Sequence, residues 1–99
     1  MTKKYNVNIT DLAQGDLEHI FYYIAADNLN NASRFIFELE KKVYSLENYP
    51  ERHALIPENE YFGANYRHLI HKKHRIIYRV TKKAVFILRI LHGAKILEL

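Results

Sequence analysis

The sequence predicts an α+β domain in which a twisted antiparallel sheet packs on an N-terminal helical hairpin. Apolar residues recur at steps of three and four between positions 11 and 46, which is typical of two amphipathic helices. β-Branched and aromatic residues dominate positions 66–91, which favours strands. The predicted order is one strand, two helices and three strands. A chain of 99 residues has the length of one domain, residues 1–99.

The first elements are a short strand and a helix. Residues 5–9 alternate apolar side chains with asparagines, as a half-buried strand does. Thr10 or Asp11 can cap the helix that follows. The apolar stripe of this helix continues to about Ala26, although Gly15 disfavours the helix by about 1 kcal/mol relative to alanine.

A second stripe runs from Ala32 to Leu46 and predicts the second helix of the hairpin. Pro50 ends this segment, because the residue before a proline disfavours helical geometry. Residues 51–65 show no period and contain a proline and a glycine, so we expect a loop. Residues 66–71 read as another short strand.

Two apolar runs, residues 76–80 and 85–91, predict a β-hairpin. The turn at residues 81–84 lacks Asn-Gly or Asp-Gly, so we expect a loop longer than two residues. A register with Val80 opposite Phe86 separates apolar from basic side chains. It places Ile76, Tyr78, Phe86, Leu88 and Ile90 against the helices, and Arg75, Ile77, Arg79, Ile87, Arg89 and Leu91 on the opposite face.

Charge is distributed unevenly along the chain. Residues 1–49 hold five basic and seven acidic side chains, a net of −2, whereas residues 50–99 hold ten and four, a net of +6. A basic half favours an anionic partner, either nucleic acid or an acidic protein segment, although solvation of an exposed sheet face explains it equally well.

Composition excludes several classes. The absence of cysteine excludes disulfides and a thiolate metal site. The opening residues lack a signal-peptide pattern and no stretch is apolar enough to span a bilayer, so we expect a cytoplasmic protein without membrane association. His68, His71 and His74 invite a metal hypothesis, but strand alternation points His71 away from the other two, so we predict no metal site.

The ordered segments DLEHIFYYIA, NASRFIFELEKKVYSLENYP, YRHLIHKKHRIIYRV and VFILRILHGA resemble the RelE/ParE superfamily of toxins from type II toxin–antitoxin pairs. The resemblance covers nearly the whole chain. It implies a cognate antitoxin as partner, with no cofactor and no small-molecule substrate. We expect the antitoxin to cover the basic and apolar sheet face formed by Arg75, Ile77, Arg79, Ile87, Arg89 and Leu91.

The resemblance leaves three functions open. ParE-like members inhibit DNA gyrase, and the ending ILRILHGA looks more like that branch, with Lys95, Ile96 and Leu97 as expected contacts. RelE-like members cleave messenger RNA on the ribosome. The third reading is a toxin-like domain that has lost activity and acts only in a complex.

RNA cleavage by the 2′-hydroxyl needs a base, an acid and a cation that stabilises the phosphate. By resemblance, Arg67 and Arg75 would hold the phosphate and His92 would exchange a proton. Relatives that use a glutamate base would place it at Glu58 or Glu60. Whether this chain is an enzyme depends on the choice between these functions.

Overall fold

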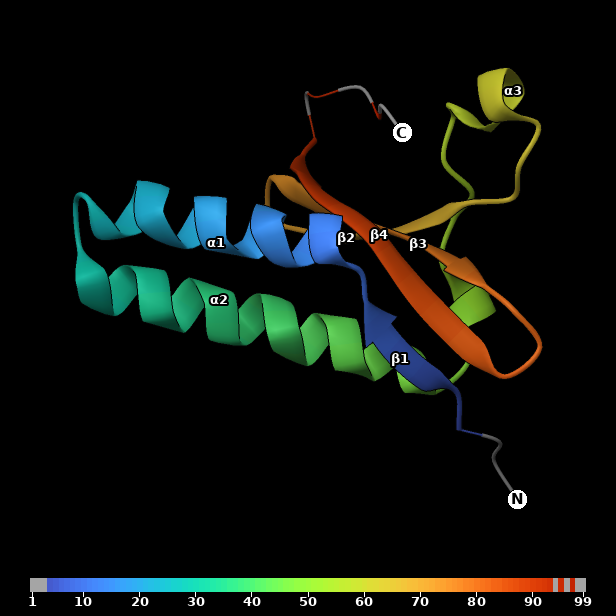
Figure 1. Ribbon diagram of the computed structural model, residues 1–99, viewed down its shortest axis with the longest axis horizontal. Helices are drawn as coiled ribbons and strands as arrows, with labels where there is room; N and C mark the ends of the chain where they lie inside the picture. The colour runs from blue at the N-terminus through green and yellow to red at the C-terminus, as the bar shows by residue number, and fades with distance from the viewer. Residues whose placement is uncertain (1–3, 94, 96, 98–99) are drawn as a thin grey trace.

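The computed structural model describes residues 4–93, 95 and 97. The fold has the predicted order of one strand, two long helices and three strands (Figure 1). The elements are β1 (Asn6–Ile9), α1 (Asp11–Ala25), α2 (Leu29–Tyr44), the 3₁₀ turns η1 (Ser45–Glu47) and η2 (Pro50–Arg52), α3 (Asn59–Phe62), β2 (Arg67–His71), β3 (His74–Val80) and β4 (Ala84–His92).

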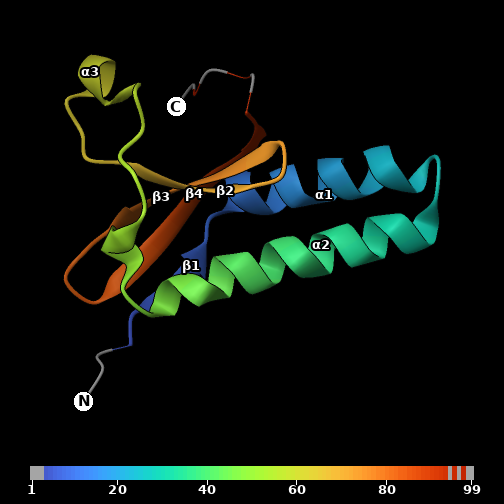
Figure 2. The same ribbon diagram turned by 180° about the vertical axis from the view of Figure 1, so that it is seen from behind.

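The four strands form one sheet in the order β1-β4-β3-β2. The three C-terminal strands are antiparallel, as predicted. β1 pairs in parallel with residues 84–87 of β4, which makes the sheet mixed. Helices α1 and α2 form an antiparallel hairpin whose far end extends beyond the sheet (Figures 1 and 2). No helix among the described residues is long and apolar enough to cross a membrane.

Side-chain caps begin both long helices. The Thr10 hydroxyl accepts a hydrogen bond from the backbone N–H of Ala13 (3.3 Å), which confirms one of the two predicted caps. The Asn28 side chain accepts from the N–H of Asn31 (2.9 Å). The second helix therefore begins at Leu29, earlier than its apolar stripe indicated.

The pairing of β3 with β4 follows the predicted register only at one end. Ile76 lies opposite Ile90, as predicted. A register shift then places Tyr78 opposite Ile87, and Leu88 has no partner in this ladder. The extra residue on β4 is the signature of a β-bulge. Between the bulge and the β3–β4 turn, the side chains of β4 therefore lie on the face opposite to the predicted one.

The bulge corrects the predicted faces of β4. Val85 and Ile87 are fully buried in the main core, whereas Phe86 and Leu88 are only half-buried. The prediction that Phe86 and Leu88 face the helices was therefore wrong, as was the placement of Ile87 on the opposite face. The main core comprises Ala13, Leu17, Leu39, Val43, Leu46, Leu69, Ile76, Tyr78, Val85, Ile87 and Ile90.

Of two predicted connections, the β3–β4 turn is confirmed and residues 51–65 differ. The N–H of Thr81 donates to the carbonyl of Ala84 (2.8 Å), and the Thr81 hydroxyl accepts from the N–H of Ala84 (3.2 Å). Residues 81–83 separate Val80 from Ala84, so the β3–β4 connection is longer than two residues, as predicted, and a side chain supplies one of its hydrogen bonds. Residues 51–65 contain more than loop, since part of η2 and all of α3 lie within them.

Candidate functional site

The sheet face opposite the main core carries a second, smaller hydrophobic cluster, which we call the tail cluster. It contains Ile56, Ile77, Leu91 and Leu97, and Tyr66 packs against it. Leu97 is only 2% exposed. Leu97 is therefore part of the fold and packs with residues of β3, β4 and the segment that precedes β2; with Lys95 it is the described part of the C-terminal tail.

A buried ion pair fixes this arrangement. Arg75, on β3, is 6% exposed, and its two terminal nitrogens donate to the two carboxylate oxygens of Glu58. Nη2 of Arg75 also donates to the carbonyl of Lys95 (3.0 Å), and the N–H of Leu97 donates to Glu58 (3.1 Å). The bidentate pair therefore joins β3, the segment before β2 and the tail.

The electrostatics of the pair keep Glu58 ionised. The hydrogen bonds from Arg75 are the main cause that lowers the pKa of Glu58 to about 2, and the N–H of Leu97 adds to them against the opposing effect of burial. A carboxylate with this pKa does not take up a proton near neutral pH. Glu60, the other glutamate that the resemblance offered as a base, is exposed on α3.

Arg67 lies away from Arg75. It shares a face of β2 with the buried Leu69, because the two are separated by two positions. Its Nη1 donates to the carbonyl of His53 (2.7 Å). The neighbouring Tyr78 donates its hydroxyl to the carbonyl of Pro50, and burial raises the pKa of Tyr78 to about 12.

His92 lies on the helix side of the sheet. It is paired with His74, with 5.6 Å between the ring centroids, and His74 lies 5.3 Å from the ring of Phe35 on α2. Burial lowers the pKa of His74, which favours the neutral ring. Arg75 faces the tail cluster on the opposite side, so the structure does not bring together the three residues expected of a nuclease.

A cleft between α1 and β4, which we call the α1–β4 cleft, encloses about 620 Å³. Arg89 lines it and donates to the Asp16 carboxylate from Nε (2.8 Å) and Nη2 (2.9 Å). Asp16 also accepts from the N–H of Ile90 (2.9 Å). Arg89 was predicted on a basic face with Arg75; instead its guanidinium reaches α1. Further lining residues are His19, Tyr23, His92 and Lys95.

Other residues of the expected antitoxin surface are already covered within this chain. Ile77, Ile87 and Leu91 are buried, the first and last in the tail cluster. Arg79 is exposed, and its guanidinium carbon lies 4.8 Å from the centroid of the Phe86 ring, a cation–π contact. Arg79 is therefore an accessible member of the expected surface, with the half-buried Phe86 beside it.

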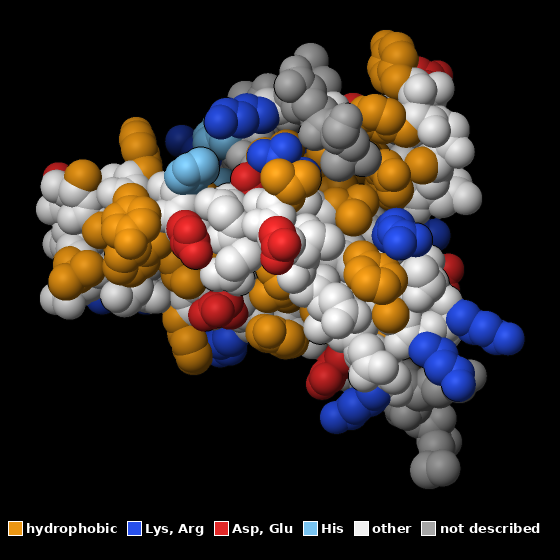
Figure 3. Space-filling view, in the orientation of Figure 1, with side chains coloured by type: hydrophobic (Ala, Val, Ile, Leu, Met, Phe, Trp, Pro, Cys, Tyr) orange, Lys and Arg blue, Asp and Glu red, His pale blue; other side chains and the backbone are white. Residues whose placement is uncertain are grey.

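The residues expected to contact the target also differ in exposure. Lys95 is exposed, whereas Leu97 is buried in the tail cluster. Ile96 lies outside the described residues. Figure 3 shows Lys and Arg side chains gathered around the end of the sheet that carries the β3–β4 turn, and Asp and Glu side chains along the helices.

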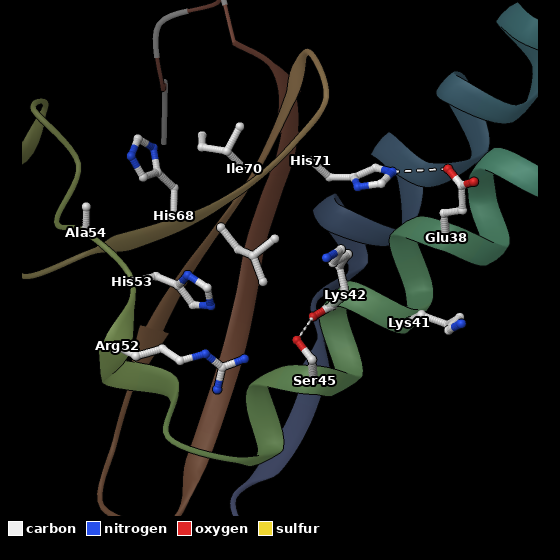
Figure 4. Close-up of a pocket in the computed structure, with 11 residues that line it drawn as sticks. Glu38, Lys41, Lys42, Ser45, Arg52, His53, Ala54, His68, Ile70 and His71 are labelled. Carbon is white, nitrogen blue, oxygen red and sulfur yellow. Dashed lines mark hydrogen bonds and ion pairs between the residues drawn. The ribbon is translucent and has the colours of Figure 1, made fainter.

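One site was missed by sequence reasoning. A groove of about 770 Å³ separates the second half of α2 from β2, and Lys41, Lys42, Arg52 and His53 line it (Figure 4). Burial is the main cause that lowers the pKa of His53, with Arg52 and Lys42 adding to it. The adjacent lysines in the last turn of α2 were a signal in the sequence, but a cationic helix end is common and does not by itself indicate a site.

A strand, two antiparallel helices and a sheet with an antiparallel three-stranded end have the arrangement of the RelE/ParE fold. The fold is similar to a chain of the chromosomal ParDE toxin–antitoxin system from P. aeruginosa, with 21% identity, a TM-score of 0.71, and coverage of 90% of this chain and 96% of that one. It is also similar to a chain of the toxin–antitoxin complex RelBE2 from Mycobacterium tuberculosis, with 22% identity, a TM-score of 0.69, and coverage of 96% and 98%. These identities show the fold alone.

Residues 7–97 match the family described as the ParE toxin of the type II toxin–antitoxin system parDE. The chain therefore belongs to the ParE toxin family and to the RelE/ParE superfamily of type II toxins. No curated protein matches the sequence.

Proposed function

We propose that this chain is a cytoplasmic toxin that inhibits DNA gyrase by binding it, without hydrolysis, and that a cognate antitoxin neutralises it. The observation that carries the proposal is the burial and hydrogen bonding of Arg75. Its side chain is buried and its terminal nitrogens are bonded to Glu58 and to the Lys95 carbonyl. A residue that stabilises a phosphate must reach the phosphate, whereas the terminal nitrogens of Arg75 are already bonded inside the protein.

The position of His92 supports the same reading. A proton-transfer group and a phosphate-binding cation act on one substrate only when both are within hydrogen-bond reach of it. His92 contacts His74 on the helix side, while Arg75 faces the tail cluster on the other side. RNA cleavage by this pair would require the bonds of Arg75 to break and the two groups to approach across the sheet.

The α1–β4 cleft is the proposed contact surface for the target. Tyr23 is 85% exposed at this cleft, and Lys95 is exposed beside it. An aromatic side chain and a cation at a cleft that Ile20, Ile24 and Ile90 also line suit a protein target, because such anchors carry much of the binding energy in interfaces. We place the antitoxin contact at the exposed Arg79 and the half-buried Phe86 beside it.

The test is a pair of assays on the purified chain. Supercoiling by gyrase should be inhibited, or cleaved DNA trapped, at concentrations that leave ribosome-bound messenger RNA intact. Lys95→Glu and Tyr23→Ala should each weaken inhibition by about tenfold or more, the loss expected of an interface anchor worth about 1.4 kcal/mol. Their unfolding midpoints should equal that of the parent, because both side chains are exposed.

Lys82→Glu is the matched control, since this lysine is exposed in the β3–β4 turn and makes the same change in net charge. Deleting residues 94–99 is a poorer test, because it removes Leu97 from the tail cluster. Codon-specific cuts in messenger RNA that disappear in Arg75→Ala or His92→Ala, with the fold intact, would overturn the proposal in favour of the RelE-like function. Inactivity in both assays would favour a domain that acts only in a complex.

A further inference from the structure

Strand β2 forms one edge of the sheet, and the chain itself covers only half of that edge. The N–H of His68 donates to the carbonyl of Ala54 (3.1 Å), and the N–H of Ile56 donates to the carbonyl of Tyr66 (3.0 Å). Residues 54–56 thus run along the start of β2 as a short antiparallel neighbour. This pairing ends at His68, and no described backbone group bonds to the outer side of residues 69–71.

The alternation of a strand places the next free groups at Ile70. Tyr66 and His68 direct their main-chain groups away from β3, so Ile70, two positions further on, directs its N–H and C=O the same way. The side chain of Ile70 is 56% exposed. An edge with an unpaired N–H and C=O is a template for another extended segment.

The groove beside this open edge is cationic. Leu69 lines it, with Lys41 and Lys42 of α2 on one side and Arg52 on the other (Figure 4). Among the described residues that line the groove, Glu38 is the one carboxylate, and it is already bound by Lys72 (3.2 Å) and His71 (3.2 Å).

We propose that this open edge binds an extended acidic segment of a partner protein as an additional strand, paired with the backbone of Ile70. Alternate residues of such a strand point to opposite faces. Those that face the groove meet Lys41, Lys42 and Arg52 and should be acidic. Those on the other face lie beside the exposed Ile70 side chain and should be apolar. The proposal does not depend on whether gyrase is the target.

A peptide is favoured over a nucleic acid by the main-chain geometry. The N–H and C=O of Ile70 match the spacing of a second polypeptide strand, whereas phosphates alone would bind the cations and leave this donor and acceptor unused. The main-chain groups of Ile70 and the charges of the lysines should therefore have separate effects on binding. Loss of the Ile70 N–H should weaken a peptide strand, and loss of the lysine charge should weaken any anion.

The probe is a short synthetic peptide that alternates glutamate with valine, added to the full-length chain near neutral pH. We expect binding that weakens with added salt and slows hydrogen exchange at the Ile70 amide. Ile70→Pro removes the outward N–H at an edge position that tolerates proline, and should weaken binding by about tenfold, equivalent to about 1.4 kcal/mol. Ile70→Val keeps the N–H and should bind as the parent does.

Three further measurements test the assignment. The same peptide N-methylated at alternate residues should not bind, and Lys42→Glu should weaken binding of the unmodified peptide. The proposal is wrong if the peptide does not bind, or if Ile70→Pro, shown to be folded by its unfolding transition, binds it as well as Ile70→Val does. Equal binding of a single-stranded oligonucleotide, insensitive to Ile70→Pro, would also overturn it and identify the groove as a nucleic-acid site.

Discussion

The two faces of the sheet are closed by different physical means. On one face, the helices and the sheet bury the eleven residues of the main core between them, and the ion pair of Arg89 with Asp16 joins α1 to β4 beside that core. On the other, four residues form the tail cluster, and a buried ion pair holds the covering segments in place. Apolar burial is non-directional and tolerates many arrangements, whereas a bidentate ion pair has one geometry. The first face therefore depends mainly on apolar burial, whereas the second, with its smaller cluster, depends more on a directional ion pair.

The largest effect is expected in the main core. Ile87→Ala should lower the free energy of unfolding by about 2–5 kcal/mol, because it leaves a cavity among fully buried neighbours. Leu88→Ala should cost less than half as much, since the bulge leaves Leu88 half-buried. Urea unfolding of the two variants measures the difference directly. A larger loss for Leu88→Ala would contradict the bulged register.

A smaller effect is expected at the ion pair. Glu58→Gln leaves Arg75 buried with a weaker acceptor, and should cost about 1–3 kcal/mol. The loss should be local, so hydrogen exchange at the amides of Leu97 and Ile77 should accelerate more than exchange at Leu39 in α2. Glu60→Gln, at an exposed position of α3, is the control and should change neither the free energy of unfolding nor the exchange rates of these amides. Uniform acceleration in Glu58→Gln would mean that the two faces are one cooperative unit.

Acid should loosen the tail face through the same carboxylate. The pKa of Glu58 is lowered from 4.5 to about 2, chiefly by Arg75, so its ionised form is the one that folding stabilises. That contribution is complete above about pH 4.5 and decreases as the pH falls toward about 2. The stability difference between the parent and Glu58→Gln should therefore narrow over this window. A difference that stays constant with pH would show that Glu58 is not stabilised as its ion.

The smallest effects concern two glycines, one for each face. A Cβ added at Gly15 in α1 meets no atom within 4 Å, so Gly15→Ala should stabilise the domain by about 0.5–1 kcal/mol through helix propensity. Gly63, which ends α3, has φ +61, a conformation that other residues adopt only with strain. Gly63→Ala should therefore destabilise the segment that holds Glu58. The thermal unfolding midpoint should therefore rise in Gly15→Ala and fall in Gly63→Ala.

Local sequence determined the elements because their signals are short-range. The apolar stripe of α2 and its end before Pro50, the alternation at residues 5–9 and the β-rich runs at 76–80 and 85–91 each depend on neighbours a few positions apart. The Thr10 cap, the order of the elements and the family resemblance followed from the same patterns. Ile76, Tyr78 and Ile90 were correctly predicted in the main core.

The candidate site was decided by tertiary structure, because its contacts join distant parts of the chain. The bulge that moves Ile87 into the core depends on how both strands meet the helices. The pairing of Arg75 with Glu58, 17 positions apart, and of Arg89 with Asp16, 73 positions apart, has no local signal. By resemblance, the sequence offered Arg75 as a phosphate-binding residue. Only the fold shows that its terminal nitrogens bind Glu58 and the tail, because a buried cation bonds whatever carboxylate the packing brings to it.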